Sequence, residues 1–576
     1  MLPSLVFPTV STLLPLSAAL QTGRRSQNNG NPTDVRRDVA LNVPLRLYAV
    51  KRPIDGSWQS LSIEFSYMAD YFGNLTTPNQ LSYNLLANLQ DLSGSPIIIR
   101  AGGSTANVAV FNASQELAVE NHWNGSTNTG LEGARTDQPS LTNIGPAWFE
   151  AFQTSPEGTR FIYDLNYRDN SSAGVASTVD VAKRVWDTLG PDLLYAYEIS
   201  NEMERWGGRY RSDEWGPELY TEEYLRYTDL IEEAIWGGSE DGLQSQPIFQ
   251  MGTFMGSGNK TINTPWNSEV VLDLGINRKQ QIRSTSQHDY HGSNCASTKE
   301  ISTLRQNLLN HTNMANRAFP HQQMAPYVDE THGVTYVIGE TNSISCQGRD
   351  GVSNVFGTAL WYLDYTLFIA SNISAVGGMY FHMGTPYRYS LWAPYEGATN
   401  HSALVRPSYY GAWVLATAIG NGKVSSGQNE TKTETETAPS SSGAYSPYYS
   451  GDGAPKKVVH PLIAEETLTA YALYRTAPSH AIDSVIILNL EPYNSTANYT
   501  RPSINVTLPD RIQTNGIVRR LTASGSDVKD FAQTDITFAG RSVSKEGLVG
   551  GDEVTETWAP GDSVLVGDAE AVLITF

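Results

Sequence analysis

The sequence predicts an α/β fold: a (β/α)8 TIM barrel with an appended C-terminal antiparallel β-sandwich domain. Through the first two thirds of the chain, short apolar runs alternate with longer segments of helical periodicity. After about Gly420 the pattern changes to short alternating runs at even spacing, which is typical of a sandwich. A doubly wound open sheet is the alternative to the barrel, but no glycine-rich phosphate loop follows the first strand.

The expected barrel covers residues 51–415. Its strands are near-continuous apolar runs bounded by Gly, Pro and Asn, as buried parallel strands are. The runs are Leu61–Phe65, Ile97–Arg100, Phe161–Asn166, Leu194–Ser200, Ile248–Gly252, Arg283–Tyr290, Val334–Glu340 and Val376–His382. The helices expected between them include Leu81–Leu92, Val179–Leu189, Thr221–Trp236, Ile301–Asn310 and Ser353–Ala370.

Two further segments follow the barrel. Residues 424–456 are rich in Ser, Gly, Thr and Glu, and we expect a low-complexity insertion or linker there. Residues 457–576 are the expected sandwich, with strands at Leu468–Tyr474, Ser484–Leu490, Ser503–Leu508, Gly516–Leu521, Ser563–Val566 and Ala571–Phe576. A strand at 40–50, before the first barrel strand, is expected to join this domain.

The N-terminus and the sequons predict an exported glycoprotein. Residues 1–20 are apolar and end near Ser17-Ala18-Ala19, as a signal peptide does, although a basic n-region is missing. A buried or lipid-anchored N-terminus is the alternative. Asn-x-Ser/Thr sequons are frequent and include Asn74, Asn112, Asn124, Asn310, Asn372, Asn400, Asn494 and Asn505. We therefore expect a secreted, N-glycosylated protein.

The two cysteines, Cys295 and Cys346, form an isolated pair. In an oxidising compartment such a pair predicts one disulfide, worth about 4 kcal/mol for a loop of roughly 50 residues. Two cysteines without clustered histidines do not make a zinc site, and we expect neither a metal nor a cofactor. A net charge of -20 disfavours nucleic acid as a partner, and no later stretch reaches the length of a membrane span.

Two carboxylates stand at the ends of expected barrel strands. Glu202 ends the fourth in YAYEISNE, and Glu340 ends the seventh in TYVIGETNS. Hydrolysis of a glycosidic bond needs one protonated and one ionised carboxyl group, and separate strands allow separate environments. Asn201 beside Glu202 supplies an amide for a sugar 2-hydroxyl. Asn-Glu and Gly-Glu are common dipeptides, so neither is informative alone. The prediction depends on finding one after the fourth expected strand and the other after the seventh. Glu198, on the same strand face as Glu202, is either a supporting residue or a salt-bridge partner inside the barrel.

Several strings resemble the fungal and bacterial branch of glycoside hydrolase family 79. They are SIEFSYMADYFGN, IIIRAGGSTAN, NIGPAWFEAF, YEISNE, GETNSISC, ALWYLDY and RPSYYGAW, and they extend the resemblance over nearly the whole mature chain. The resemblance implies a retaining enzyme with Glu202 as acid/base and Glu340 as nucleophile. Tyr290, at the end of the sixth strand, resembles the clan's tyrosine that bonds the nucleophile, with a barrel-rim aromatic as the alternative. Ser200 replaces a glycine of many relatives, and its small size is expected to leave the geometry undisturbed.

Sugar recognition is expected from other strand ends. Glu64 either bonds sugar hydroxyls or pairs internally with Arg100, and His288 either lines the cleft or is structural. The turn Gly103-Ser104-Thr105 lets backbone amides approach a ligand closely. After the eighth strand, backbone amides and the side chains of Tyr380, His382, Tyr387 and Arg388 are candidate donors to a uronate carboxylate.

The expected activity is removal of terminal β-glucuronic acid, or its 4-O-methyl form, from a glycan by double displacement, without a cofactor. We expect a monomer whose partner is a glucuronate-containing carbohydrate. The alternatives are an endo-β-glucuronidase of the heparanase type and a carbohydrate-binding protein that has lost catalysis. An endo enzyme requires basic subsites, and no Lys/Arg clusters occur in the loops.

Overall fold

The structure is a computed structural model that describes most of the chain. The described residues are 35–48, 51–123, 139–237, 247–255, 265–295, 300–394, 403–420, 455–529 and 535–576. The expected signal peptide at 1–20 and nearly all of the expected insertion at 424–456 lie outside them. Within the described part of the chain, no helix combines the length and apolar character that a bilayer crossing requires.

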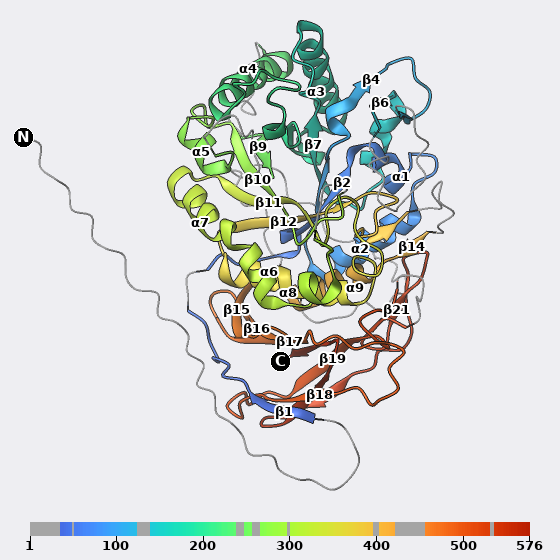
Figure 1. The fold of residues 1–576 in the computed structure, drawn as a ribbon, viewed down its shortest axis with the longest axis vertical. Coiled ribbons are helices and arrows are strands. Elements are labelled where there is room, and N and C mark those ends of the chain that lie inside the picture. Colours follow the sequence, from blue (N-terminus) through green and yellow to red (C-terminus); the bar gives the residue numbers. More distant parts are fainter. Residues whose placement is uncertain are drawn as a thin grey trace, which may run out of the picture.

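Eight parallel strands close into a barrel with helices around it, as predicted (Figure 1). In chain order they are β2 (Gln59–Glu64), β3 (Ile98–Gly102), β7 (Arg160–Leu165), β8 (Leu194–Ile199), β9 (Phe249–Phe254), β10 (Ile282–Tyr290), β11 (Thr335–Asn342) and β12 (Val376–Met383). The barrel closes where β12 pairs with β2. Because helices cover the outer face, each strand is buried on both sides, and this produces the apolar runs in the sequence.

The helices follow local signals. Asn79 caps α2 by accepting a hydrogen bond from the Ser82 N–H, and Gly94 ends that helix in the left-handed conformation. Gly190 and Pro191 interrupt α3. The helices are α1 (Met68–Phe72), α2 (Gln80–Ser93), α3 (Ser172–Leu193), α4 (Pro217–Trp236), α5 (Ser268–Asp273), α6 (His311–Arg317), α7 (Phe319–Tyr327), α8 (Gly357–Asn372) and α9 (Pro407–Ile419).

One expected helix, Ile301–Asn310, is wrong in extent. Only a short helical turn, Leu304–Leu308, forms within it. Asn310 instead caps α6, because its side chain accepts a hydrogen bond from the Asn313 N–H. An N-cap residue is not helical itself, so the chain starts a new helix there.

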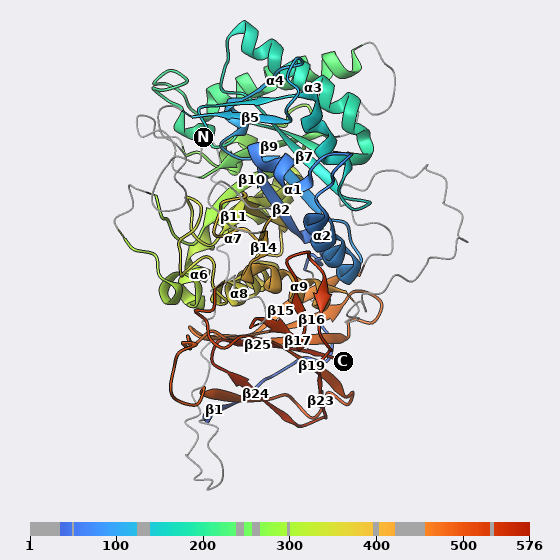
Figure 2. The ribbon, with the colours of Figure 1, turned by 90° about the vertical axis from the view of Figure 1, so that its right-hand side faces the viewer.

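Helices α8 and α9 lie between the barrel and the C-terminal domain (Figures 1 and 2). Helix α8 contacts β15 (Lys457–Ala464) and β16 (Leu468–Arg475) of that domain, and α9 contacts β20 (Thr537–Phe538) and β25 (Glu570–Thr575). Almost every residue of both helices is buried, which explains why their sequences are apolar all round. Trp361, Tyr362 and Trp413 are therefore core aromatics.

The C-terminal domain is a sandwich of two sheets. One sheet has the order β15-β16-β17-β25-β19-β20, and the other has the order β1-β18-β24. The main strands are β15 (Lys457–Ala464), β16 (Leu468–Arg475), β17 (Ile482–Asn489), β18 (Ser503–Thr507), β19 (Gly516–Thr522), β24 (Ser563–Gly567) and β25 (Glu570–Thr575). The minor strands β20 (Thr537–Phe538) and β23 (Glu556–Trp558) both pair with β19.

The expected N-terminal strand at 40–50 is wrong in position. The strand is β1 (Val35–Ala40), which pairs in parallel with β18. Leu41 and Val43 follow it into the sandwich core without strand structure, because Pro44 has no N–H to donate to a ladder. The true strand is mostly exposed and charged, so apolar alternation does not reveal it.

Two short sheets complete the barrel mouth. The β4-β6-β5 sheet follows β3, and the β13-β14 pair follows β12. Their bounds are β4 (Ala109–Phe111), β5 (Val119–His122), β6 (Leu141–Ile144), β13 (Trp392–Ala393) and β14 (Leu404–Val405). Both sheets are insertions after barrel strands, at the edge of the barrel where a site is expected.

Cys295 and Cys346 form the predicted disulfide, which joins the loop after β10 to the loop after β11. The two cysteines are 51 residues apart in sequence. In the loop-entropy model, removal of both thiols by Cys295→Ser and Cys346→Ser should lower the free energy of unfolding by about 4 kcal/mol. Urea unfolding measures this difference, and wild-type protein in reductant is the matched control. Equal unfolding midpoints for the oxidised wild type and the double variant would contradict the prediction.

Candidate active site

Glu202 and Glu340 meet at the carboxyl edge of the barrel. Glu340 lies in β11, and Glu202 follows three residues after β8. One carboxylate oxygen of each, together with a ring nitrogen of His288, all lie within 4.8 Å of one another. Retaining glycosidases hold their carboxyl groups about 5–5.5 Å apart, whereas inverting enzymes need roughly 6.5–9.5 Å. The geometry is therefore of the retaining kind.

The Glu340 carboxylate is held by two donors. Arg100 Nη1 donates to Oε2 at 2.7 Å, and the Tyr290 hydroxyl donates to Oε1 at 2.8 Å. Burial alone would raise the pKa of Glu340, but the charges of His382, His288 and Arg100 outweigh burial and hold it below its ordinary value. Glu340 is thus ionised and fixed in direction, which is what a nucleophile requires.

Glu202 has a more open setting. Its side chain keeps 21% of its surface exposed, against 9% for Glu340. His288 Nδ1 lies 3.2 Å from one oxygen of Glu202, and Arg205 Nε lies 3.9 Å from the other. An acid/base must exchange its proton with solvent between the two chemical steps, and this exposure permits it.

The turn that carries Glu202 is strained and fastened at several points. Ser200 and Glu202 have positive φ angles of 83° and 49°, which side-chain-bearing residues adopt at a cost of about 1–3 kcal/mol each. Asn107 bonds the backbone of Asn201 through both its side-chain atoms, and Thr253 O accepts from the Glu202 N–H. Ser200 therefore carries a backbone cost that its small size does not suggest.

Arg100 organises the base of the site. It is fully buried and donates to Glu198 and Asn201, each at 2.7 Å, besides Glu340. Glu198 is therefore the salt-bridge partner inside the barrel. Asn201 accepts from Arg100 through its oxygen, which orients the amino group of the same amide.

Glu64 does not pair with Arg100, so that alternative is wrong. It accepts hydrogen bonds from the backbone N–H and hydroxyl of Thr105 at 2.8 and 2.6 Å. His382 Nε2 and the Tyr387 hydroxyl lie 3.3 and 3.2 Å from its other oxygen. A β-carbon on Gly103 would lie 2.7 Å from Glu64, and the φ of Gly103 is +105°, so only glycine fits there.

The remaining sequence-predicted residues divide between the rim and the core. Ser104 is half-buried beside Glu64, whereas Tyr380 packs in the barrel interior with Ile98, Ile162 and Tyr195. The expectation that Tyr380 contacts a ligand therefore does not fit its place in the fold. Arg388 lies 4.0 Å from Asp350. Tyr290, Tyr387 and Tyr389 cluster at the rim with Tyr67 and Met255 packed against them.

Sequence reasoning missed four residues of this constellation. They are Tyr67, Tyr389, Asn107 and Glu204. The strings SIEFSYM and AGGSTAN contain Tyr67 and Asn107, but single polar or aromatic residues in loops carry no periodic signal. A metal cation is disfavoured among these groups, because both oxygens of Glu340 already accept from donors and Arg100 supplies a fixed positive charge.

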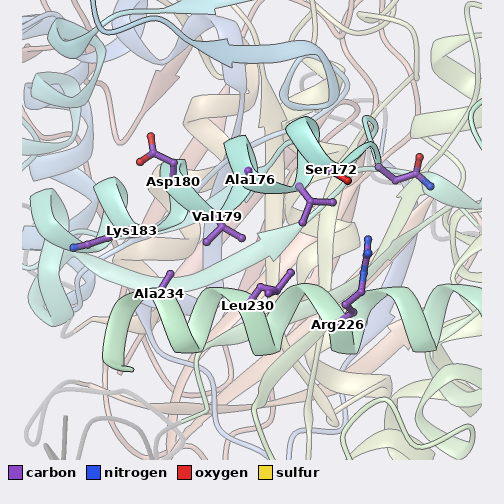
Figure 3. A pocket seen from close by; sticks show the side chains of 10 residues that line it. Ser172, Ala176, Val179, Asp180, Lys183, Arg226, Leu230 and Ala234 are labelled. Atoms are coloured by element: carbon purple, nitrogen blue, oxygen red, sulfur yellow. The ribbon is translucent and has the colours of Figure 1, made fainter. Parts of the chain in front are cut away.

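The molecular surface is also hollowed elsewhere. A groove of about 520 Å³ runs between α3 and α4, where Val179 and Leu230 lie between the two helices (Figure 3). It is on the helical outside of the barrel, whereas active sites of this fold lie at the carboxyl ends of the strands. The groove is therefore separate from the carboxylate pair.

A barrel that presents an ionised glutamate opposite a more exposed one, at retaining distance, defines a glycoside hydrolase. Comparison with known proteins narrows the class. A model of the glycosyl hydrolase family 79 C-terminal beta domain matches residues 470–573. A Neurospora crassa protein named Beta-glucuronidase is 31% identical over 552 residues, which cover 89% of this chain and 89% of that protein. The chain belongs to glycoside hydrolase family 79.

Other relatives agree. An Aspergillus niger protein, also named Beta-glucuronidase, is 28% identical over 568 residues, covering 96% of this chain and 92% of that protein. The crystal structure of a 4-O-α-L-rhamnosyl-β-D-glucuronidase from Fusarium oxysporum superposes with a TM-score of 0.71 at 22% identity, covering 93% of this chain and 100% of that one. The family 51 arabinofuranosidase AbfB of Bifidobacterium longum gives a TM-score of 0.54 at 12% identity, covering 94% and 99%. The two structural likenesses bear on the fold alone.

Proposed function

We propose that the protein is a retaining exo-β-glucuronidase. The observation that carries the mechanism is the pair of glutamates with unlike environments within 4.8 Å of each other. Glu340 attacks the anomeric carbon while protonated Glu202 donates to the departing oxygen. Glu202 then deprotonates a water, which hydrolyses the glycosyl–Glu340 ester and releases a sugar of retained configuration.

Glucuronate as the sugar is supported by the names of the curated relatives. At the site, the Tyr387 hydroxyl and His382 lie on the side of the eighth strand, where both contact Glu64. Burial alone would lower the pKa of His382, but the charges of Glu340 and Glu64 outweigh it and raise the pKa, which favours a charged donor. A cationic donor suits a uronate carboxylate better than a neutral hydroxymethyl group.

Hydrolysis of p-nitrophenyl β-glucuronide, with the β-glucoside and β-galactoside in parallel, tests the proposal. We expect kcat/KM to be highest for the glucuronide by about a hundredfold or more, because a site built around a charged group rejects analogues that leave its donors unpaired. Activity confined to a neutral glycoside would overturn the uronate assignment. Activity on none of the three, but on a glucuronate polymer, would favour endo-cleavage instead.

We also propose that the protein is exported and N-glycosylated. The disulfide and the exposed sequon asparagines Asn112, Asn372 and Asn494 support this. Asn310 is different, because it is buried and its side chain bonds both Asn313 N–H and Glu466. Glycopeptide mapping of protein from a secreting host should therefore find glycans on the exposed sequons and none on Asn310.

A further inference from the structure

Glu204, two residues after Glu202, is a buried carboxylic acid that the mechanism above does not use. It lies in the short helical turn Met203–Arg205 and has no exposed surface. Its Oε1 accepts a hydrogen bond of 2.6 Å from the Met255 N–H, just after β9. Its Oε2 is buried and has no hydrogen-bond partner among the residues that the structure describes.

This contact ties the acid/base turn to the end of β9. Two other bonds join the same elements, from Glu202 N–H to Thr253 O and from the Thr253 hydroxyl to Ser200 O. The turn needs such support because Ser200 and Glu202 both have positive φ angles. The turn is thus bonded to the end of β9 on both sides: through the backbone N–H of Glu202 and through the side chain of Glu204.

The charges around Glu204 couple it to Glu202. Burial, and then the negative charge of Glu202, raise the pKa of Glu204 to about 8, while the Met255 N–H and the Arg205 charge act in the opposite direction. Tyr220 of α4 also faces it, and its own pKa is raised by burial and by the nearby carboxylates. Glu204 is therefore uncharged at neutral pH, unlike most glutamates.

We propose that Glu204 is a positioning residue that orients Glu202 through its hydrogen bond to the Met255 N–H. A neutral acceptor at position 204 keeps this contact, whereas an apolar side chain removes it.

The inference rests on the proposed function only for the identity of the acid/base. Glu204→Gln keeps an oxygen acceptor for the Met255 N–H but cannot ionise. We expect this variant to keep most of the wild-type kcat, because the Met255 N–H keeps its acceptor.

Two further variants separate positioning from general damage. Glu204→Met removes the acceptor as well, so it should lower kcat over the whole pH range, and more for methyl β-glucuronide than for p-nitrophenyl β-glucuronide, whose leaving group needs little protonation. Glu204→Gln should restore kcat relative to Glu204→Met. Glu570→Gln, which alters a buried carboxyl of raised pKa in the sandwich, is the matched control and should leave both rates unchanged.

The rates are measured on the p-nitrophenyl and methyl β-glycosides of whichever sugar the wild type hydrolyses fastest. If that sugar is glucose, the proposed sugar specificity fails, while the ratio of the two rates still decides the role of Glu204. Equal losses of kcat on both glycosides in Glu204→Met, or no recovery of kcat in Glu204→Gln, overturns the role proposed here.

Discussion

Glu340→Gln is expected to lower kcat/KM on p-nitrophenyl β-glucuronide by about four orders of magnitude or more, on the order of 5–6 kcal/mol of transition-state stabilisation. The amide has the shape of the carboxylate, and its oxygen can accept from Arg100 while its amino group donates to the Tyr290 hydroxyl, so the fold should survive. It carries no negative charge to attack the anomeric carbon or to stabilise the oxocarbenium-like transition state. Steady-state kinetics beside a thermal unfolding curve measure both quantities.

Glu202→Gln is the matched control because it removes the other carboxylate of the pair. With p-nitrophenolate as leaving group, formation of the glycosyl–enzyme needs little acid assistance, whereas its hydrolysis loses the general base. Added azide should therefore accelerate turnover of Glu202→Gln and give a β-glycosyl azide, with no such effect in Glu340→Gln. Azide rescue of Glu340→Gln with a β-glycosyl azide would reverse the two assignments.

The parts of the site that the sequence predicts are those attached to regular elements. Glu202 and Glu340 follow apolar runs that have to be strands, and the carboxyl ends of barrel strands converge on one edge. The same runs predict the barrel itself, because burial on both faces leaves them apolar. An exposed strand such as β1, with its charged residues, leaves no comparable trace.

The polar contacts depended on register, which one sequence does not specify. Ser62 of β2 lies opposite Arg100 of β3, and Glu64 lies opposite Gly102. Glu64 is therefore nearer to the rim than Arg100, where it meets Thr105, and Arg100 meets the deeper Glu198 instead. Glu204 and Asn107 are in turns, where neither period nor composition predicts what a side chain contacts.

Arg100→Met is the variant with the largest expected effect on stability. The guanidinium is buried and bonds Glu198, Glu340 and Asn201, with Asp164 3.7 Å away. Methionine has a similar length but no charge, so the carboxylates stay buried without their cation. Loss of one partner from a buried ion pair costs about 3–5 kcal/mol. Urea unfolding at pH 7 should show that the free energy of unfolding falls by this amount. Arg100→Lys keeps the positive charge but not the planar guanidinium with its several donors, and its free energy of unfolding should fall by less.

The pH dependence of that loss separates charge from packing. In the wild type, Glu340 has a pKa below its unfolded value of 4.5, so its ionisation contributes stability above that pH, and the contribution is lost as the pH falls toward the folded pKa. In Arg100→Met the pKa of Glu340 rises, and the contribution disappears. The difference in unfolding free energy between wild type and variant should therefore be largest near pH 7 and shrink below about pH 4. The acid limb of kcat/KM should move to higher pH in parallel, because the nucleophile then takes up a proton more readily. A difference that is the same at both pH values would mean that Arg100 acts by filling space, and the ionised state of Glu340 would then need another source.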